Sequence, residues 1–142
     1  FFTLYGPWGR PDMALFKFTK GILQGKFISV FNYGNHARDF TYIDDAVRAI
    51  LLVEKLKFPK KKLYRNFNVG NGESVELKKY IKEIEKNLNL KAKINYLPMQ
   101  LGDVKKMLSN NSKLSKFKEF KKRTHYKIGV KKFIDWYRNY YN

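Results

Sequence analysis

The strand-like segments of this 142-residue chain are few, short and separated by helical segments. Runs rich in β-branched and aromatic residues occur at residues 26–31, 38–42, 64–69 and 92–97, next to turn-forming Gly, Asn or Pro. So few short strands seldom build a complete doubly wound parallel sheet. The pattern therefore predicts a mixed α/β domain without a complete dinucleotide-binding sheet.

Four segments carry apolar residues at helical spacing. The residues expected to face the interior are Ala14, Leu15, Phe18 and Ile22; Val47, Ile50, Leu51 and Leu56; Leu77, Ile81, Ile84 and Leu88; and Val130, Phe133, Ile134 and Tyr137. Asp12, Asp44 and Ser74 are the expected N-caps of the first three helices, because a short polar side chain there accepts a hydrogen bond from a free backbone N–H. We expect the last helix to span residues 129–141.

The composition is that of a folded chain rather than a disordered or membrane-spanning one. Hydrophobic residues make up 44% of the chain, enough to bury a core. No apolar run approaches the roughly 20 residues that a transmembrane helix needs. The lack of Cys excludes disulfides and thiolate metal sites, and two isolated His residues form no ligand cluster. We therefore expect no metal site, no membrane partner and a cytoplasmic location.

The net charge of +18 is the strongest compositional signal. Such an excess attracts polyanions such as nucleic acid, anionic lipid or phosphorylated substrates. The basic residues concentrate at 55–65, 78–93 and 105–132, mostly as single charges between apolar residues. This distribution is typical of the solvated faces of ordinary helices, so we expect no specific nucleic-acid partner.

Sequence motifs for catalysis are missing from the chain. No GxGxxG or GxxGxxG opens a helix after a strand, and no GxSxG occurs. We interpret Gly70-Asn71-Gly72 as a tight turn. Adjacent Asp44 and Asp45 would point apart on a helix, and we interpret them as acids that complement the helix dipole. We therefore predict no catalytic residue in this chain.

Two arginines in loops are candidates for binding an anion. Arg10 follows a Gly/Pro loop, and Arg38 lies between turn residues and an extended segment. A guanidinium group offers a planar fork of donors that matches phosphate or carboxylate oxygens. A salt bridge is the competing interpretation, from Arg10 to Asp12 and from Arg38 to Asp39.

Five segments together resemble one known family. In order, they are FFTLYGPWGRPDMALFKF, FNYGNHARDFTYIDDAVRAI, FNVGNGESVEL, LPMQLGDV and KKFIDWYRNYY. The chain resembles, over nearly its whole length, the C-terminal part of the NAD-dependent sugar-nucleotide epimerases and dehydratases, which are extended short-chain dehydrogenases. This resemblance implies that residues 1–142 are the nucleotide-sugar-binding portion of an extended Rossmann-type epimerase. A few of its elements would complete a Rossmann domain whose N-terminal dinucleotide-binding half is absent.

Within the family, the resemblance is greatest to the UDP-glucuronate 4-epimerase branch. It implies that NAD is the cofactor and that Phe1 lies near the nicotinamide. It also implies that Thr3 hydrogen-bonds the sugar. Arg10 matches an arginine that grips the anionic substrate at its diphosphate and glucuronate end.

The same resemblance assigns the nucleotide end of the substrate. Ser29 and Phe31 belong to a segment whose backbone is implied to read uracil, and Arg38 matches the diphosphate-binding arginine. Gln100 lies where galactose epimerases carry a second phosphate-binding arginine, so it favours the glucuronate branch. Leu101 replaces the usual Pro, a departure that loosens the loop carrying Gln100.

The implied reaction converts UDP-glucuronate to UDP-galacturonate through a 4-keto intermediate. The family's catalytic pair is Tyr-x-x-x-Lys, and no Tyr of this chain has Lys four residues later. We therefore expect the chain alone to be inactive, and its full-length form to be a homodimer. Two alternatives stay open. The chain could come from another nucleotide-sugar epimerase or dehydratase, or it could be a non-catalytic basic module from a truncated gene that binds polyanions.

Overall fold

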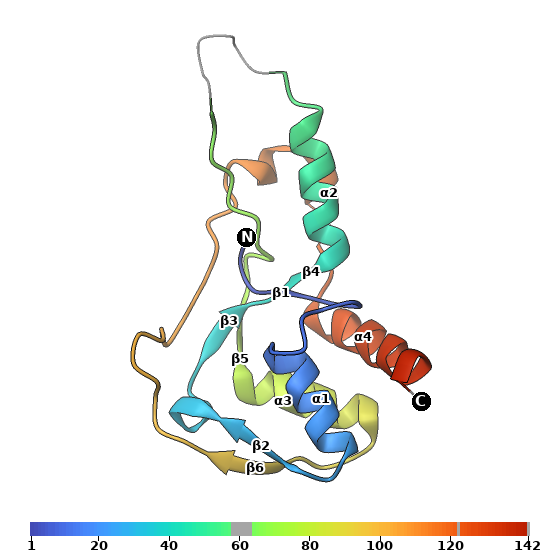
Figure 1. Cartoon of the computed structure of the whole chain (residues 1–142). Coiled ribbons are helices and arrows are strands. Elements are labelled where there is room, and N and C mark those ends of the chain that lie inside the picture. Colours follow the sequence, from blue (N-terminus) through green and yellow to red (C-terminus); the bar gives the residue numbers. More distant parts are fainter. Residues whose placement is uncertain (58–63, 122, 142) are drawn as a thin grey trace.

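The structure is a computed structural model that describes residues 1–57, 64–121 and 123–141 (Figure 1). Its helices are α1 (Ala14–Leu23), α2 (Ile43–Glu54), α3 (Leu77–Leu88) and α4 (Tyr126–Tyr141). Its strands pair as β1 (Leu4–Tyr5) with β4 (Thr41–Tyr42), β2 (Phe27–Val30) with β6 (Lys93–Tyr96), and β3 (Ala37–Asp39) with β5 (Ser74–Glu76). The first two pairs are parallel and the third is antiparallel. The predicted mixed α/β class with short strands is confirmed.

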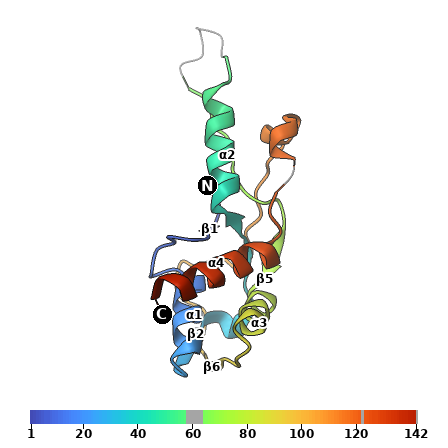
Figure 2. The same cartoon turned by 90° about the vertical axis from the view of Figure 1, so that its right-hand side faces the viewer.

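The described residues form two packed regions. Helices α1, α3 and α4 gather beside the β2–β6 and β3–β5 pairs, whereas α2 extends away from them (Figure 1, Figure 2). The larger core lies among the three gathered helices and the strands that contact them. A smaller core lies beside α2, where Ala46 and Ala49 meet Val69, Leu114 and Phe120.

Aromatic rings join the start of the chain to the larger core. The ring of Phe40 stacks on Tyr80 of α3 with centroids 3.9 Å apart. Tyr5 of β1 meets both rings edge-on, at 6.0 and 5.9 Å. Burial raises the pKa of the Tyr5 and Tyr80 hydroxyls far above the usual tyrosine value. Gly129 of α4 gives Tyr5 its space, since a Cβ there would overlap the tyrosine hydroxyl.

Asp39, at the end of β3, holds three segments together through its buried carboxylate. The Oδ1 atom accepts from the backbone N–H of Asn71 at 2.6 Å, and Oδ2 accepts from the N–H of Gly72 at 3.0 Å. Ser109 donates to Oδ2 from both its N–H and its hydroxyl, at 2.9 and 2.6 Å. Gly70 is required beside this carboxylate, because a Cβ would overlap the Ser109 side chain. The segment predicted as a tight turn therefore wraps a buried anion.

The three predicted N-caps are wrong. Helix α1 is preceded by Met13, α2 by Tyr42 and α3 by Glu76, and none of these makes a side-chain cap hydrogen bond. Asp12 pairs with Arg10 instead, and Ser74 belongs to β5. Asp44 lies within the first turn of α2, two residues beyond the residue that precedes the helix.

Asp44 and Asp45 both lie in the first turn of α2, as their dipole interpretation requires. Asp45 has a further role, because it is buried and accepts from the N–H and hydroxyl of Thr124 at 2.6 and 3.0 Å. Arg48 of the same helix also pairs with it. Asp45 therefore ties α2 to the segment that leads into α4.

The inward faces predicted for α1, α3 and α4 are confirmed. Ala14 and Leu77 are partly buried against the larger core. Ten further residues of these faces are buried in it: Leu15, Phe18, Ile22, Ile81, Ile84, Leu88, Val130, Phe133, Ile134 and Tyr137.

The face predicted for α2 is wrong. Val47, Ile50 and Leu51 are 45%, 53% and 50% exposed, while the small residues Ala46 and Ala49 are buried. Leu56, predicted on the same face, lies beyond the end of the helix. Periodicity located an apolar stripe correctly, but it could not show which side of the helix the chain itself covers.

The predicted strand at residues 64–69 is also wrong, because its described residues join no sheet. This segment accepts one backbone hydrogen bond from the start of the chain, from the N–H of Phe2 to the carbonyl of Val69 at 2.9 Å. A strand exists through a row of such bonds to a neighbour. The other three predicted strands are confirmed. Residues 26–31 contain β2, residues 92–97 contain the edge strand β6, and residues 38–42 are divided between β3 and β4.

Replacing Asp39 by Asn should lower the free energy of unfolding by about 3 kcal/mol, because an amide cannot accept all four bonds and leaves buried N–H groups unpaired. Urea denaturation followed by circular dichroism measures this change. The matched control is the exposed first-turn carboxylate of Asp44, whose change to Asn should cost under about 1 kcal/mol. Equal losses of unfolding free energy from the two substitutions would contradict the role of the Asp39 carboxylate in holding the three segments together.

Candidate functional site

Four of the predicted substrate-binding residues line one cavity of about 310 Å³: Thr3, Ser29, Phe31 and Arg38. They come from different parts of the chain, namely the start of the chain, β2, the turn after β2, and β3. The cavity wall also includes the charged side chains of Asp12, Lys17 and Asp103. The structure thus brings together residues that were assigned to the sugar, the base and the diphosphate.

Arg38 is held with its guanidinium toward the loop after β6. Its side chain is only 16% exposed, and Nη2 donates to Asp103 Oδ1 at 2.6 Å. Nη1 donates to the carbonyls of Ala37 and Lys105 at 3.1 and 3.4 Å. The competing interpretation, an ion pair with Asp39, is wrong, because the Asp39 carboxylate faces the Gly70–Gly72 loop.

Asp103 and His36 belong to this site, and the sequence analysis missed both. The His36 side chain is 5% exposed, and its Nε2 lies 3.4 Å from Asp103 Oδ2. Both residues line the same cavity as Arg38. The Gly-Asp turn at residues 102–103, with its positive φ at Gly102, was a signal that could have indicated Asp103. His36 had no such signal, because the loop from residue 100 to 106 is what covers it.

Phe1, Thr3 and Arg10 line a second cavity of about 390 Å³. It adjoins the first, since Thr3 and Met13 line both. Arg10 forms its predicted salt bridge with Asp12 through Nε, at 3.0 Å from Oδ1, and through Nη2. The Arg10 hydrogen bonds lower the pKa of Asp12. Because both side chains are more than half exposed, this pair contributes little to stability and an anionic ligand can compete for the guanidinium.

Gln100 lines neither of these cavities. It is exposed in the loop after β6, and its carbonyl accepts from the N–H of Asp103 at 3.3 Å. The same loop therefore carries Gln100 at its start and delivers Asp103 to Arg38. The structure places Gln100 near the site along the chain, but not in its wall.

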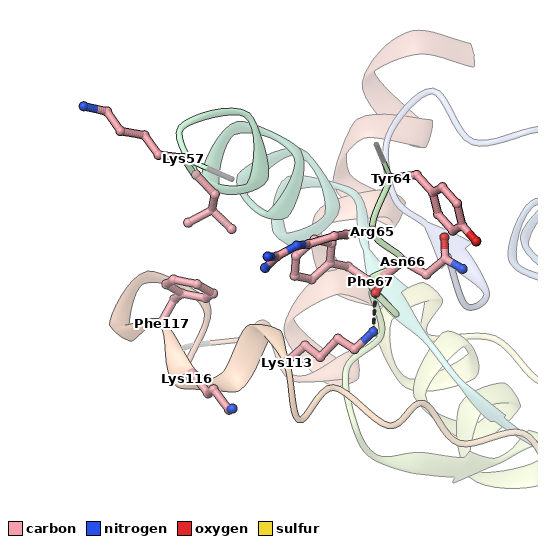
Figure 3. Close-up of a pocket in the computed structure, with 9 residues that line it drawn as sticks. Lys57, Tyr64, Arg65, Asn66, Phe67, Lys113, Lys116 and Phe117 are labelled. Carbon is pink, nitrogen blue, oxygen red and sulfur yellow. Dashed lines mark hydrogen bonds between the residues drawn. The ribbon is translucent and has the colours of Figure 1, made fainter. Parts of the chain in front are cut away.

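A larger cavity lies elsewhere and is lined by none of the predicted site residues. Its volume is about 710 Å³, and its wall includes the cations Lys57, Arg65, Lys113 and Lys116. The rings of Phe67 and Phe117 line the same cavity, and Figure 3 shows the Lys57 side chain pointing away from both of them. Lys113 is held in place by a 2.8 Å hydrogen bond from Nζ to the carbonyl of Asn66. The sequence shows the excess of positive charge, but not that these four cations line one cavity.

Within the part of the chain that the structure describes, no group of three or more His, Cys, Asp or Glu side chains is placed to hold a metal ion. No described helix is both long enough and apolar enough to cross a bilayer.

The comparisons with known proteins point to one family. The model of the "NAD dependent epimerase/dehydratase family" matches residues 1–70. An uncharacterized 37.6 kDa protein from Escherichia coli O111:H- is 46% identical over 99% of this chain and 46% of its own length. Over nearly its whole length, the chain is similar to proteins of the NAD-dependent epimerase/dehydratase family.

Two further relatives are both UDP-glucuronate 4-epimerases. UDP-glucuronate 4-epimerase 4 of Arabidopsis thaliana is 43% identical over the whole of this chain and 36% of its own length. A crystal structure of UDP-glucuronic acid 4-epimerase from Bacillus cereus, in complex with UDP-glucuronic acid and NAD, matches with a TM-score of 0.88. That match has 30% identity and covers 97% of this chain and 43% of the other.

The chain spans less than half the length of these relatives. The structural match confirms the predicted fold class, which is part of an extended Rossmann-type epimerase fold.

Proposed function

We propose that residues 1–142 are the nucleotide-sugar-binding portion of an NAD-dependent UDP-glucuronate 4-epimerase, which forms UDP-galacturonate through a 4-keto intermediate. The observation that carries the proposal is the shared cavity of Thr3, Ser29, Phe31 and Arg38. The names of the relatives agree, since one is a UDP-glucuronate 4-epimerase and another was crystallised with UDP-glucuronic acid and NAD. Another sugar-nucleotide epimerase or dehydratase of the family is the nearest alternative.

The base would be read by the free edge of β2. Strand β6 pairs with one edge of β2, where Leu97 donates its N–H to the carbonyl of Val30. Successive residues of a strand direct their backbone groups to opposite edges, so Ser29 and Phe31 present theirs away from β6. No other described strand pairs with that edge. Its N–H and C=O groups are therefore open to the edge of a planar base such as uracil.

Arg38 would bind the diphosphate. Its guanidinium is mostly buried and already oriented by Asp103 and two carbonyls, so little conformational entropy is lost when a ligand joins it. Lys17 on α1 adds a second positive charge to the cavity wall. A charge-assisted contact to phosphate in this partly desolvated position is stronger than it would be at the surface.

The sugar and the cofactor would meet at the second cavity. Thr3 lines both cavities, so it can hydrogen-bond a sugar whose diphosphate lies against Arg38. Arg10 would exchange Asp12 for the sugar carboxylate. Phe1 and Ile43 give this cavity an apolar side that suits one face of a nicotinamide ring.

NAD fits this chain only in part. When bound, it would take the hydride from the sugar and return it to the opposite face. The described residues offer an apolar wall at Phe1 but no Gly-rich loop at a helix start that could hold its phosphates. The cofactor's phosphates, and the Tyr-x-x-x-Lys pair, would therefore belong to the N-terminal half of the full-length enzyme, for which we also propose a homodimeric state and a cytoplasmic location.

Replacing Arg38 by Ala should weaken UDP-glucuronate binding roughly 10- to 100-fold, because one charge-assisted contact is lost. Isothermal titration calorimetry on the chain joined to its N-terminal half measures the dissociation constant. Arg38→Lys should recover only part of the affinity, since it keeps the charge but loses the planar fork. Lys20→Ala, on the part of α1 outside the cavity, is the control. An unchanged dissociation constant in Arg38→Ala would overturn the assignment.

The 142-residue chain alone should convert no UDP-glucuronate when NAD is supplied, because it lacks the Tyr-x-x-x-Lys pair. Proton NMR of the sugar's anomeric signals detects the galacturonate product directly. The chain joined to its N-terminal half is the positive control. Product formation by the chain alone would refute the prediction that it holds no catalytic residue.

A second candidate function is binding of polyanions, which the cation-lined cavity of Figure 3 favours. Its four cations line the same cavity as Phe67 and Phe117, and cations with aromatic rings suit single-stranded nucleic acid. This function needs neither NAD nor a nucleotide sugar.

The double substitution Lys113→Glu and Lys116→Glu separates this second candidate from a general charge effect. If the cavity binds single-stranded DNA, the slope of log affinity against log salt should fall by roughly 1.4, from two lost phosphate contacts. Lys82→Glu with Lys86→Glu on α3 changes the net charge equally and is the control. Fluorescence anisotropy with a labelled oligonucleotide gives both slopes. Equal changes in the two variants would refute a specific site.

A further inference from the structure

His36 is a buried histidine directly behind the proposed diphosphate site. It immediately precedes β3, its carbonyl accepts from the N–H of Leu77 at 2.8 Å, and its side chain is 5% exposed. The buried Nε2 atom makes no hydrogen bond within the described structure. Its nearest charged partner is Asp103, whose Oδ2 lies 3.4 Å away. A buried, unpaired ring nitrogen beside a carboxylate is an uncommon arrangement that calls for an explanation.

Asp103 is shared between His36 and Arg38. Its Oδ1 atom accepts from Arg38 Nη2 at 2.6 Å and from the N–H of Val104 at 2.8 Å, whereas Oδ2 faces His36. The two oxygens therefore serve two different partners. With a neutral imidazole, the Asp103 charge cancels that of Arg38. With an imidazolium, the three groups together carry one net positive charge.

The other charges around His36 are mostly positive. Two cavities border the residue. Besides Asp103 and Arg38, the titratable or charged side chains that line them are Asp12 and Lys17 on the α1 side, Glu76 and Lys78 at the β5–α3 junction, and Lys105 and Lys106 on the loop after β6. Five cations thus oppose three carboxylates in the walls of the two cavities, and an entering diphosphate would add negative charge beside His36.

We propose that His36 is a positioning residue that takes up a proton when a diphosphate binds, and that it then holds Asp103 through Oδ2 so that Arg38 keeps its positive charge for the ligand. This inference rests on the proposed nucleotide-sugar function. Histidine suits the role because it is the side chain that ordinarily changes charge between about pH 5 and pH 8. By linkage, a ligand that favours the protonated ring must bind more tightly as the pH falls through that range.

The ligand for the test is UDP-glucuronate, because its diphosphate diester and carboxylate keep their charges across this range. The protein is the 142-residue chain. Nitrogen-15 NMR of the histidine rings reports the protonation of each imidazole as the pH is varied from about 5.5 to about 8. His125, the other histidine of the chain, is exposed and serves as an internal control.

Saturating UDP-glucuronate should move the titration midpoint of the His36 ring upward by roughly one pH unit, and leave His125 unchanged. Asp103→Asn should reduce the shift of His36, because its acceptor partner is lost. His36→Gln should bind with an affinity that does not vary over the same pH range, since Gln can donate to Asp103 without titrating. A purely structural histidine would give neither the shift nor the altered pH profile.

The outcomes separate this inference from the proposed function. If the backbone amides of Thr3 and Phe31 respond to UDP-glucuronate but His36 titrates as in the free protein, the inference is overturned and the proposed function stands. If no amide responds at any pH, the proposed function is overturned, and the inference falls with it.

Discussion

The buried carboxylate of Asp39 is the contact on which the site depends. It gathers β3, the loop at Gly70–Gly72 and the segment at Ser109 by accepting four hydrogen bonds. Arg38 precedes Asp39 in β3, so the hydrogen bonds of Asp39 also fix the backbone that carries the Arg38 guanidinium. Alternation along β3 sends Asp39 to the interior and Arg38 toward the cavity. One dipeptide thus joins a buried structural anion to the cation that we propose as the diphosphate ligand.

Loops and regular elements both supply the candidate site. Asp103 and residues before Ala14 line the cavity from loops, while β2 offers a backbone edge with which no other described strand pairs. Such a site can read a base through N–H and C=O groups and a diphosphate through Arg38. Its electrostatics then depend on how many carboxylates share the cavity with the cations, which is why Asp103 and His36 matter together.

Sequence reasoning predicted the fold class, three helical faces and four residues of the cavity wall. It succeeded where one local pattern determines the outcome, as in Ile81, Ile84 and Leu88 of α3. It failed where two distant segments compete. A salt bridge from Arg38 to Asp39 was the competing interpretation, yet Asp39 binds the Gly70–Gly72 loop because its strand turns it inward. His36 could not be predicted, since its burial depends on a loop more than sixty residues away.

Helix α2 has its small residues inside and its branched residues outside. Ala46 and Ala49 contact the smaller core, while Val47, Ile50 and Leu51 face outward from the described chain. A water-exposed stripe of this kind limits colloidal stability, because copies of the chain can bury it against one another. Making the stripe polar would improve solubility in the test tube.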